Sequence, residues 1–111
     1  MRVILSLILI NTAILAYANP FKTEETKPVI RIFSGKFCPP CRKQEKIMQL
    51  PSIQDELKRY EQHKYLDVED GDKFLEYGVN AVPYLIIEKN GSSRRLVGLQ
   101  TESSILSALK D

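Results

Sequence analysis

The chain has 111 residues, enough for one small domain. It carries 16 Lys and Arg residues against 14 Asp and Glu residues, a net charge of +2, with both signs mixed along the chain. This balance excludes the clustered basic surface that nucleic-acid binding needs, and two cysteines are too few for a disulfide-stapled scaffold. An ordinary apolar core must therefore stabilise the fold.

The first 18 residues have the pattern of a signal peptide. Arg2 gives a positive start, Val3 to Ala18 is largely apolar, and Ala16-Tyr17-Ala18 is an A-x-A cleavage site. The apolar run is shorter than the roughly 20 residues of a membrane-spanning helix. We expect cleavage after Ala18 and export, into the periplasm; an uncleaved membrane anchor is the alternative. Residues 19–28 then form a polar leader, and residues 29–111 form the domain.

The domain opens with a strand followed by a helix that starts at a cysteine pair. Val29 to Phe33 is rich in β-branched residues and suits a strand covered on both faces. Ser34-Gly35-Lys36 forms the turn out of it. Cys38-Pro39-Pro40-Cys41 begins the helix, because proline is tolerated where the first helical amides lack partners.

A proline divides the helical region that follows. Pro51 ends or kinks the first helix, and Ser52 predicts a fresh start as a serine cap with an acid three residues later. Ile53, Leu57 and Tyr60 recur at helical spacing and are expected to face the core.

Turn signals separate the remaining elements. A short strand is expected at Lys64 to Val68, a short helix at Lys73 to Tyr77 closed by Gly78, and a strand at Tyr84 to Ile87. Asn90-Gly91 predicts an antiparallel hairpin to the next strand.

The last expected element is an amphipathic helix. Thr101 caps it, and Ile105, Leu106 and Leu109 are expected to face inward. The predicted order is βα(α)βαββα.

The two cysteines carry the clearest chemical signal. Thiol–disulfide exchange needs an accessible thiolate to attack and a second thiol to release the mixed disulfide. Cys38 at the helix start is favoured as a thiolate by the helix dipole, and Cys41 lies one turn further in. We expect no metal site, because zinc takes four ligands, no second cysteine pair exists, and His63 stands alone.

The spacer between the cysteines predicts a particular electrostatic setting. Pro39 and Pro40 have no N–H group, so only the amide of Cys41 and later amides can donate to the Cys38 sulfur. The pKa of Cys38 should therefore be lowered less than with a polar spacer.

The order of motifs resembles the thioredoxin superfamily over nearly all of the mature region. The matching motifs after the cysteine pair are Tyr77-Gly78-Val79, Ala81-Val82-Pro83, Lys89-Asn90-Gly91 and Val97-Gly98. The resemblance implies an α/β fold with a minimal four-stranded mixed sheet flanked by helices. It also implies a cis Val82–Pro83 bond beside the sulfurs and a redox disulfide between Cys38 and Cys41.

The resemblance further implies where a substrate binds. An extended substrate chain would lie along Val82, and Phe37, Pro83 and Gly98 would form a shallow apolar rim.

The sequence departs from the thioredoxin pattern in four places. Phe37 replaces the usual Trp, Pro51 lies later than the usual kink proline, and only ten residues separate the expected cleavage site from the first strand. Ile32 stands where thioredoxins bury an acid beneath the second cysteine. We therefore expect slow resolution of the mixed disulfide unless Glu45, Glu69 or water substitutes.

These features together predict a thiol:disulfide oxidoreductase that needs no cofactor. We expect a monomeric reductase of protein disulfides, recharged by a membrane electron-donor protein. Two alternatives remain: an oxidase of the same fold that introduces disulfides, and a non-catalytic binding module.

Overall fold

The structure is a computed structural model, and it describes residues 27–111. The predicted signal peptide (residues 1–18) and most of the predicted leader (residues 19–28) lie outside the described residues. Within residues 27–111, no helix is long and apolar enough to cross a membrane.

The described residues follow the predicted order of elements. In chain order these are β1 (Val29–Ser34), α3 (Pro39–Met48), α4 (Pro51–Leu57), β2 (Glu61–Leu66), α5 (Gly71–Glu76), β3 (Tyr84–Lys89), β4 (Ser92–Val97) and α6 (Glu102–Lys110).

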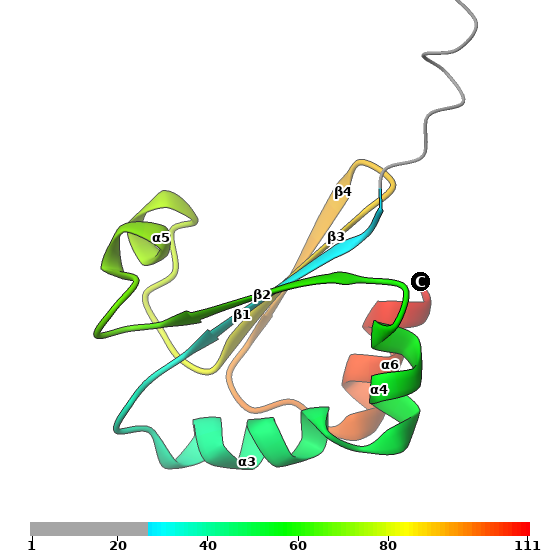
Figure 1. The fold of residues 1–111 in the computed structure, drawn as a ribbon, viewed down its shortest axis with the longest axis horizontal. Helices are drawn as coiled ribbons and strands as arrows, with labels where there is room; N and C mark the ends of the chain where they lie inside the picture. The colour runs from blue at the N-terminus through cyan, green and yellow to red at the C-terminus, as the bar shows by residue number, and fades with distance from the viewer. Residues whose placement is uncertain (1–26) are drawn as a thin grey trace, which may run out of the picture.

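The four strands form one mixed sheet, as predicted. Its order is β2-β1-β3-β4, with β1 parallel to β2 and antiparallel to β3, and β3 antiparallel to β4. Helices α3, α4 and α6 lie on one side of the sheet and α5 lies on the other (Figure 1). Because β1 is paired on both edges and covered on both faces, it is the strand that fixes where α3 begins.

The hairpin between β3 and β4 confirms the Asn90-Gly91 prediction. Asn90 has φ 52° and Gly91 has φ 79°, so both central residues adopt the left-handed conformation that a type I′ turn requires. Gly78 after α5 is also left-handed, with φ 67°, as expected for a helix C-cap.

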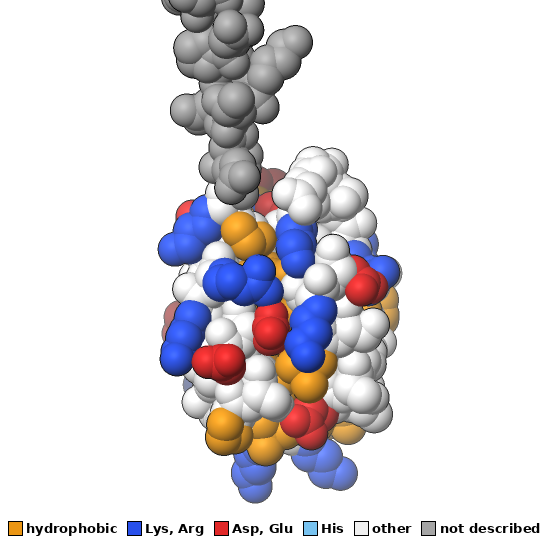
Figure 2. Space-filling view, turned by 90° about the vertical axis from the view of Figure 1, so that its right-hand side faces the viewer, with side chains coloured by type: hydrophobic (Ala, Val, Ile, Leu, Met, Phe, Trp, Pro, Cys, Tyr) orange, Lys and Arg blue, Asp and Glu red, His pale blue; other side chains and the backbone are white. Residues whose placement is uncertain are grey.

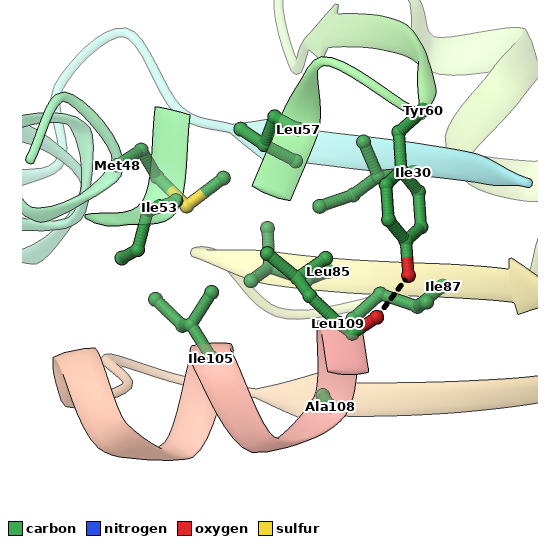
Figure 3. Close-up of a cluster of buried hydrophobic side chains, with 10 residues drawn as sticks. All are labelled: Ile30, Met48, Ile53, Leu57, Tyr60, Leu85, Ile87, Ile105, Ala108 and Leu109. Carbon is green, nitrogen blue, oxygen red and sulfur yellow. Dashed lines mark hydrogen bonds between the residues drawn. The ribbon is translucent and has the colours of Figure 1, made fainter. Parts of the chain in front are cut away.

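The main core fills the space between the sheet and helices α3, α4 and α6 (Figure 3). Its buried side chains are Ile30, Met48, Ile53, Leu57, Tyr60, Leu85, Ile87, Ile105, Ala108 and Leu109. A smaller cluster on the α5 side of the sheet contains Phe33, Val79, Tyr84 and Ile86. The two clusters account for the continuous apolar pattern of β1, which sends Ile30 to one side and Phe33 to the other.

One polar contact closes the main core. The hydroxyl of Tyr60 donates a hydrogen bond to the carbonyl oxygen of Leu109 at 2.6 Å (Figure 3). This contact joins the turn after α4 to the end of α6, so two segments distant in the sequence are held against the same sheet.

Several predicted boundaries are wrong: β2 ends at Leu66 rather than Val68, α5 spans Gly71–Glu76 rather than Lys73 to Tyr77, and two starts differ for clear reasons. Ser52 is not a cap: α4 begins at Pro51 with Leu50 as its N-cap residue, because proline fits the first helical position, and Ser52 instead donates to Glu102. Strand β2 begins at Glu61 rather than Lys64, since backbone pairing with β1 extends through a polar segment that has no apolar alternation.

The end of the molecule formed by α4 and α6 carries basic and acidic side chains interspersed over its surface (Figure 2). This face therefore has no large region of a single charge sign, which agrees with the mixed charge of the sequence.

Replacing Tyr60 by Phe should lower the free energy of unfolding by about 1 kcal/mol at neutral pH, the typical value of one hydrogen bond. Burial raises the pKa of the Tyr60 hydroxyl above its ordinary value of 10.0. The folded state thus favours the neutral phenol, so this stabilisation is full below about pH 10 and is lost as the pH rises through the folded pKa. Chemical denaturation of the wild-type and Tyr60→Phe proteins should therefore show a difference in the free energy of unfolding that narrows above about pH 10. A difference that stays constant into that range would contradict the prediction.

Candidate active site

The cysteine pair lies at the start of α3 and forms a disulfide. Cys38 is the N-cap residue of the helix, and its Cα atom lies 5.2 Å from that of Cys41. Cys38 is half-buried, whereas Cys41 is only 1% exposed. An incoming molecule can therefore reach the first sulfur more easily than the second.

The hydrogen bonding of Cys38 follows from the two prolines. The Cys41 amide donates to the Cys38 sulfur at 3.2 Å, and it is the one donor to that sulfur among residues 27–111. Pro39 and Pro40 occupy the intervening positions and have no N–H group. The prediction that donation starts at the Cys41 amide is confirmed.

The Val82–Pro83 bond is cis, as the resemblance implied, and it lies next to the cysteine pair. A methyl group built on Gly35 would lie 3.1 Å from both the Cys38 Cβ atom and the Val82 Cγ2 atom. Cys38 and Val82 therefore meet over Gly35. The amide of Gly98 donates to the Pro83 carbonyl oxygen at 2.8 Å, which holds the end of β4 against the same loop.

The four predicted substrate-contact residues differ in exposure. Phe37 is 88% exposed, and Val82 and Gly98 are half-buried. Pro83 is buried, and it contributes to the lining of the cavity beside the second cysteine.

Two residues at the site were not identified from the sequence. Gly35 is the small residue over which the neighbouring segments meet, and Asp67 lies on the loop after β2. The Asp67 carboxylate accepts a hydrogen bond from the Lys36 amide at 3.1 Å, and its other oxygen lies 3.1 Å from the same methyl position over Gly35. A carboxylate thus lies close to Cys38, although the sequence indicated only a strand residue at this position.

A cavity of about 320 Å³ lies beside the second cysteine. Cys41, Ile32 and Pro83 contribute to its lining, and so do Glu45 and Glu69, the two acids considered as substitutes for the missing buried acid. Ile32 is half-buried and apolar. The Gly35 amide donates to the Cys41 sulfur at 3.4 Å.

Gln44 connects this helix to the other side of the site. It is 3% exposed, and its Oε1 atom accepts a hydrogen bond from the Gln100 amide at 2.8 Å. Its Nε2 atom has no hydrogen-bond partner among the described residues. Because Gln100 follows Gly98 closely, Gln44 fixes the loop after β4 relative to α3.

Residues 27–111 contain no group of three His, Cys, Asp or Glu side chains placed to hold a metal ion. Within this part of the chain, the chemistry available at the site is that of the two sulfurs.

No family model matches the chain, but known proteins resemble it in sequence and in fold. It is 33% identical over 89 residues to a thioredoxin of Rickettsia typhi, a match that covers 75% of this chain and 79% of the relative. It is 28% identical over 86 residues to a thioredoxin of Methanocaldococcus jannaschii, covering 77% of this chain and 95% of that protein.

Solved structures have the same fold at lower identity. Fasciola hepatica thioredoxin superposes with a TM-score of 0.66 at 20% identity, covering 78% of this chain and 81% of its own. Oxidised mitochondrial thioredoxin 3 of Saccharomyces cerevisiae superposes with a TM-score of 0.67 at 18% identity, covering 88% of this chain and 89% of that one. The sequence match to the Rickettsia protein, which spans most of both chains and includes a cysteine pair seen here as a disulfide, establishes that this chain belongs to the thioredoxin superfamily as a thiol:disulfide oxidoreductase.

Proposed function

We propose that this protein is an exported reductase of protein disulfides. Cys38 attacks the substrate disulfide, which gives a mixed disulfide and releases one substrate thiolate. Cys41 then attacks the Cys38 sulfur, forms the Cys38–Cys41 disulfide and releases the second thiolate. The two electrons come from the dithiol, and a dithiol of a membrane electron-donor protein restores it.

The different exposure of the two sulfurs supports these roles. An attacking thiolate must reach a substrate disulfide, whereas a resolving thiol needs only to reach its neighbour. Cys38 is half-buried at the helix cap and Cys41 is buried one turn in.

The surface around Cys38 supports a protein as the substrate. Phe37 is 88% exposed, and Val97 and Leu99, which flank Gly98, are 58% and 46% exposed. Phe37 directly precedes Cys38, and Gly98 binds Pro83 next to Val82, so apolar side chains are exposed on the segments that surround the site and favour contact with a polypeptide. The substrate chain would lie along Val82, which meets Cys38 over Gly35.

The surroundings of the Cys38 sulfur favour a reductase over an oxidase. A strongly oxidising dithiol is one whose reduced form is stabilised, chiefly through its thiolate. Here the Cys38 sulfur receives one amide donor among the described residues, and an Asp67 carboxylate oxygen and the Cys38 Cβ atom each lie 3.1 Å from the same methyl position over Gly35. Both features leave a Cys38 thiolate less stabilised, which favours a reductant.

Two other functions make different predictions. An oxidase of the same fold requires an oxidising potential, near about −120 mV, and a reductase a potential near about −270 mV. A binding module requires neither cysteine.

The cysteine roles predict distinct behaviour of two serine variants with a disulfide-bonded test protein such as insulin. Cys41→Ser should accumulate a covalent mixed disulfide through Cys38 and stop turnover, because no resolving thiol remains. Cys38→Ser should form no such adduct, since Cys41 is buried. Mass spectrometry of the non-reduced proteins checks both outcomes. Equal adduct formation by the two variants would disprove the assigned roles, and full function of the Cys38→Ser, Cys41→Ser double variant in cells would establish a binding module.

Electron flow from the dithiol to the substrate predicts an equilibrium reduction potential of about −270 mV, measured against glutathione or a thioredoxin couple. Asp67→Asn keeps an oxygen for the Lys36 amide but removes the negative charge, so it should raise the potential by on the order of 10 mV. Asp72→Asn removes the same charge from an exposed position in the first turn of α5 and serves as the matched control. A wild-type potential near about −120 mV would show an oxidase instead. An Asp67→Asn shift no larger than that of the control would remove the electrostatic argument.

Export predicts the N-terminus of the mature protein. When the full chain is produced in a bacterium with two membranes, the protein should be recovered from the periplasm with Asn19 as its first residue. N-terminal sequencing of the fractionated protein measures this. Recovery in the membrane fraction with residues 1–18 retained would show the uncleaved anchor.

A further inference from the structure

The resolving step places an unfavourable charge on Cys41. In the proposed reaction Cys41 must become a thiolate before it attacks Cys38, yet it is 1% exposed and shares its cavity with Ile32, Met48 and Pro83. Burial among apolar groups disfavours the charged form of a thiol. Because Ile32 occupies the position where thioredoxins bury an acid, ionisation of Cys41 depends on the other groups around its sulfur.

The Gly35 amide is placed to do this. It donates to the Cys41 sulfur at 3.4 Å in a buried environment. A donor hydrogen bond stabilises a thiolate more than a neutral thiol, so the position of this amide affects how readily Cys41 ionises.

Arg42 holds the turn that carries this amide. Its Nη2 atom donates to the Gly35 carbonyl oxygen at 2.8 Å and to the Ser34 hydroxyl at 3.2 Å. The same atom lies 3.1 Å from a Glu45 carboxylate oxygen, which orients the guanidinium from the next turn of α3. The turn is thereby attached to the helix that contains Cys41.

Asp67 also holds the turn. Its amide donates to the Ser34 carbonyl oxygen at 3.0 Å and its carboxylate accepts from the Lys36 amide at 3.1 Å. Arg42 and Asp67 thus fix both ends of the segment in which Gly35 lies. Asp67 approaches Cys38, whereas Arg42 is adjacent to Cys41 in the chain.

We propose that Arg42 is a positioning residue for the resolving step, which holds Gly35 so that its amide stabilises the Cys41 thiolate in place of a buried acid. This inference rests on the proposed roles of Cys38 and Cys41. The Cys41 thiolate forms a bond to the Cys38 sulfur as the bond from Cys38 to the substrate breaks. The proton from Cys41 leaves to solvent, and the departing substrate thiolate takes one up.

Other charged groups near Cys41 give a competing explanation. The titratable and charged residues that line its cavity are Arg42, Glu45, Lys64, Tyr65, Glu69 and Asp70. Of these, Asp70 accepts a hydrogen bond from the Leu66 amide at 2.9 Å. If Glu45 were a proton acceptor for Cys41, removing its charge should slow resolution; if it only orients Arg42, the effect should be small.

The first experiment measures Cys41 ionisation directly. In the Cys38→Ser protein Cys41 is the one thiol, and the ultraviolet absorbance of its thiolate is recorded against pH. Adding Arg42→Gln should move the midpoint upward by roughly one pH unit. Lys43→Gln is the matched control, because it removes the same charge from the next residue, whose exposed side chain makes no hydrogen bond or ion pair with residues 27–111. Equal midpoints for the two variants would overturn the proposal.

The second experiment measures the rate of resolution. In otherwise wild-type protein, Arg42→Gln should slow release of substrate from the Cys38 mixed disulfide about tenfold at neutral pH, the size expected for a weakened hydrogen bond to a charged group. The rate should recover at high pH, where Cys41 ionises without help. A loss that is independent of pH would indicate a structural defect and overturn the proposal.

Two further variants separate the positioning role of Arg42 from the effect of its charge and from a role of Glu45. Arg42→Lys keeps the charge but cannot reproduce the donor geometry of a guanidinium, so it should recover only part of the lost rate. Full recovery would assign the effect to charge and refute the positioning role. Glu45→Gln should slow resolution far less than Arg42→Gln, and an equal loss would identify Glu45 as the proton acceptor instead. Because the thiolate titration needs no substrate, it tests Arg42 even if the proposed reductase activity fails.

Discussion

The site depends on one close approach, the meeting of three chain segments over Gly35. A methyl group there would lie 3.1 Å from atoms of Cys38, Asp67 and Val82, so any larger residue would force at least one of these neighbours to move. Glycine allows the start of α3, the loop after β2 and the loop before Pro83 to come together. Cys38, the Asp67 carboxylate and Val82 owe their spacing to this contact.

Helix α3 supports this arrangement from the core. Cys41, Gln44 and Met48 lie on its buried face, spaced so that one end of the row reaches the disulfide and the other enters the main core. Between them, Gln44 binds the Gln100 amide and so holds the loop after β4. The Gly98 amide in that loop donates to the Pro83 carbonyl oxygen. A change in how α3 packs would therefore move both sides of the site.

Local signals in the sequence predicted most of the fold. The start of α3 at the cysteine pair, the Asn90-Gly91 hairpin and the Thr101 cap each depend on backbone requirements that a few neighbouring residues satisfy, and each is confirmed. The prediction of a Ser52 cap was wrong because Pro51 and Ser52 are adjacent helix-start signals, and the helix begins at the proline. The start of β2 was missed because its pairing with β1 runs through the backbone, which leaves no pattern in polar side chains.

The electrostatic details of the site were harder to predict because they depend on tertiary contacts. The Pro39-Pro40 spacer fixed the donor to Cys38 within one helical turn, and that prediction is confirmed. Asp67, in contrast, meets the Lys36 amide across 31 positions of sequence, and nothing local distinguishes it from other acids on strand-end loops. In the sequence Arg42 resembles any solvated helix residue, and only the fold shows its contacts to Gly35 and Ser34.

The two sulfurs consequently meet opposite surroundings although they share one helical turn. Cys38 has one amide donor and a nearby carboxylate, whereas Cys41 is buried but receives an amide from a turn attached to a guanidinium. In thiol–disulfide exchange the nucleophilicity of a thiolate rises with its basicity, so a weakly stabilised Cys38 thiolate attacks well and leaves poorly. Release of the substrate then depends on how readily Cys41 ionises. If Cys41 resolves the mixed disulfide as proposed, Ile32 offers it no acid, and the Gly35 amide is a hydrogen-bond donor to its sulfur.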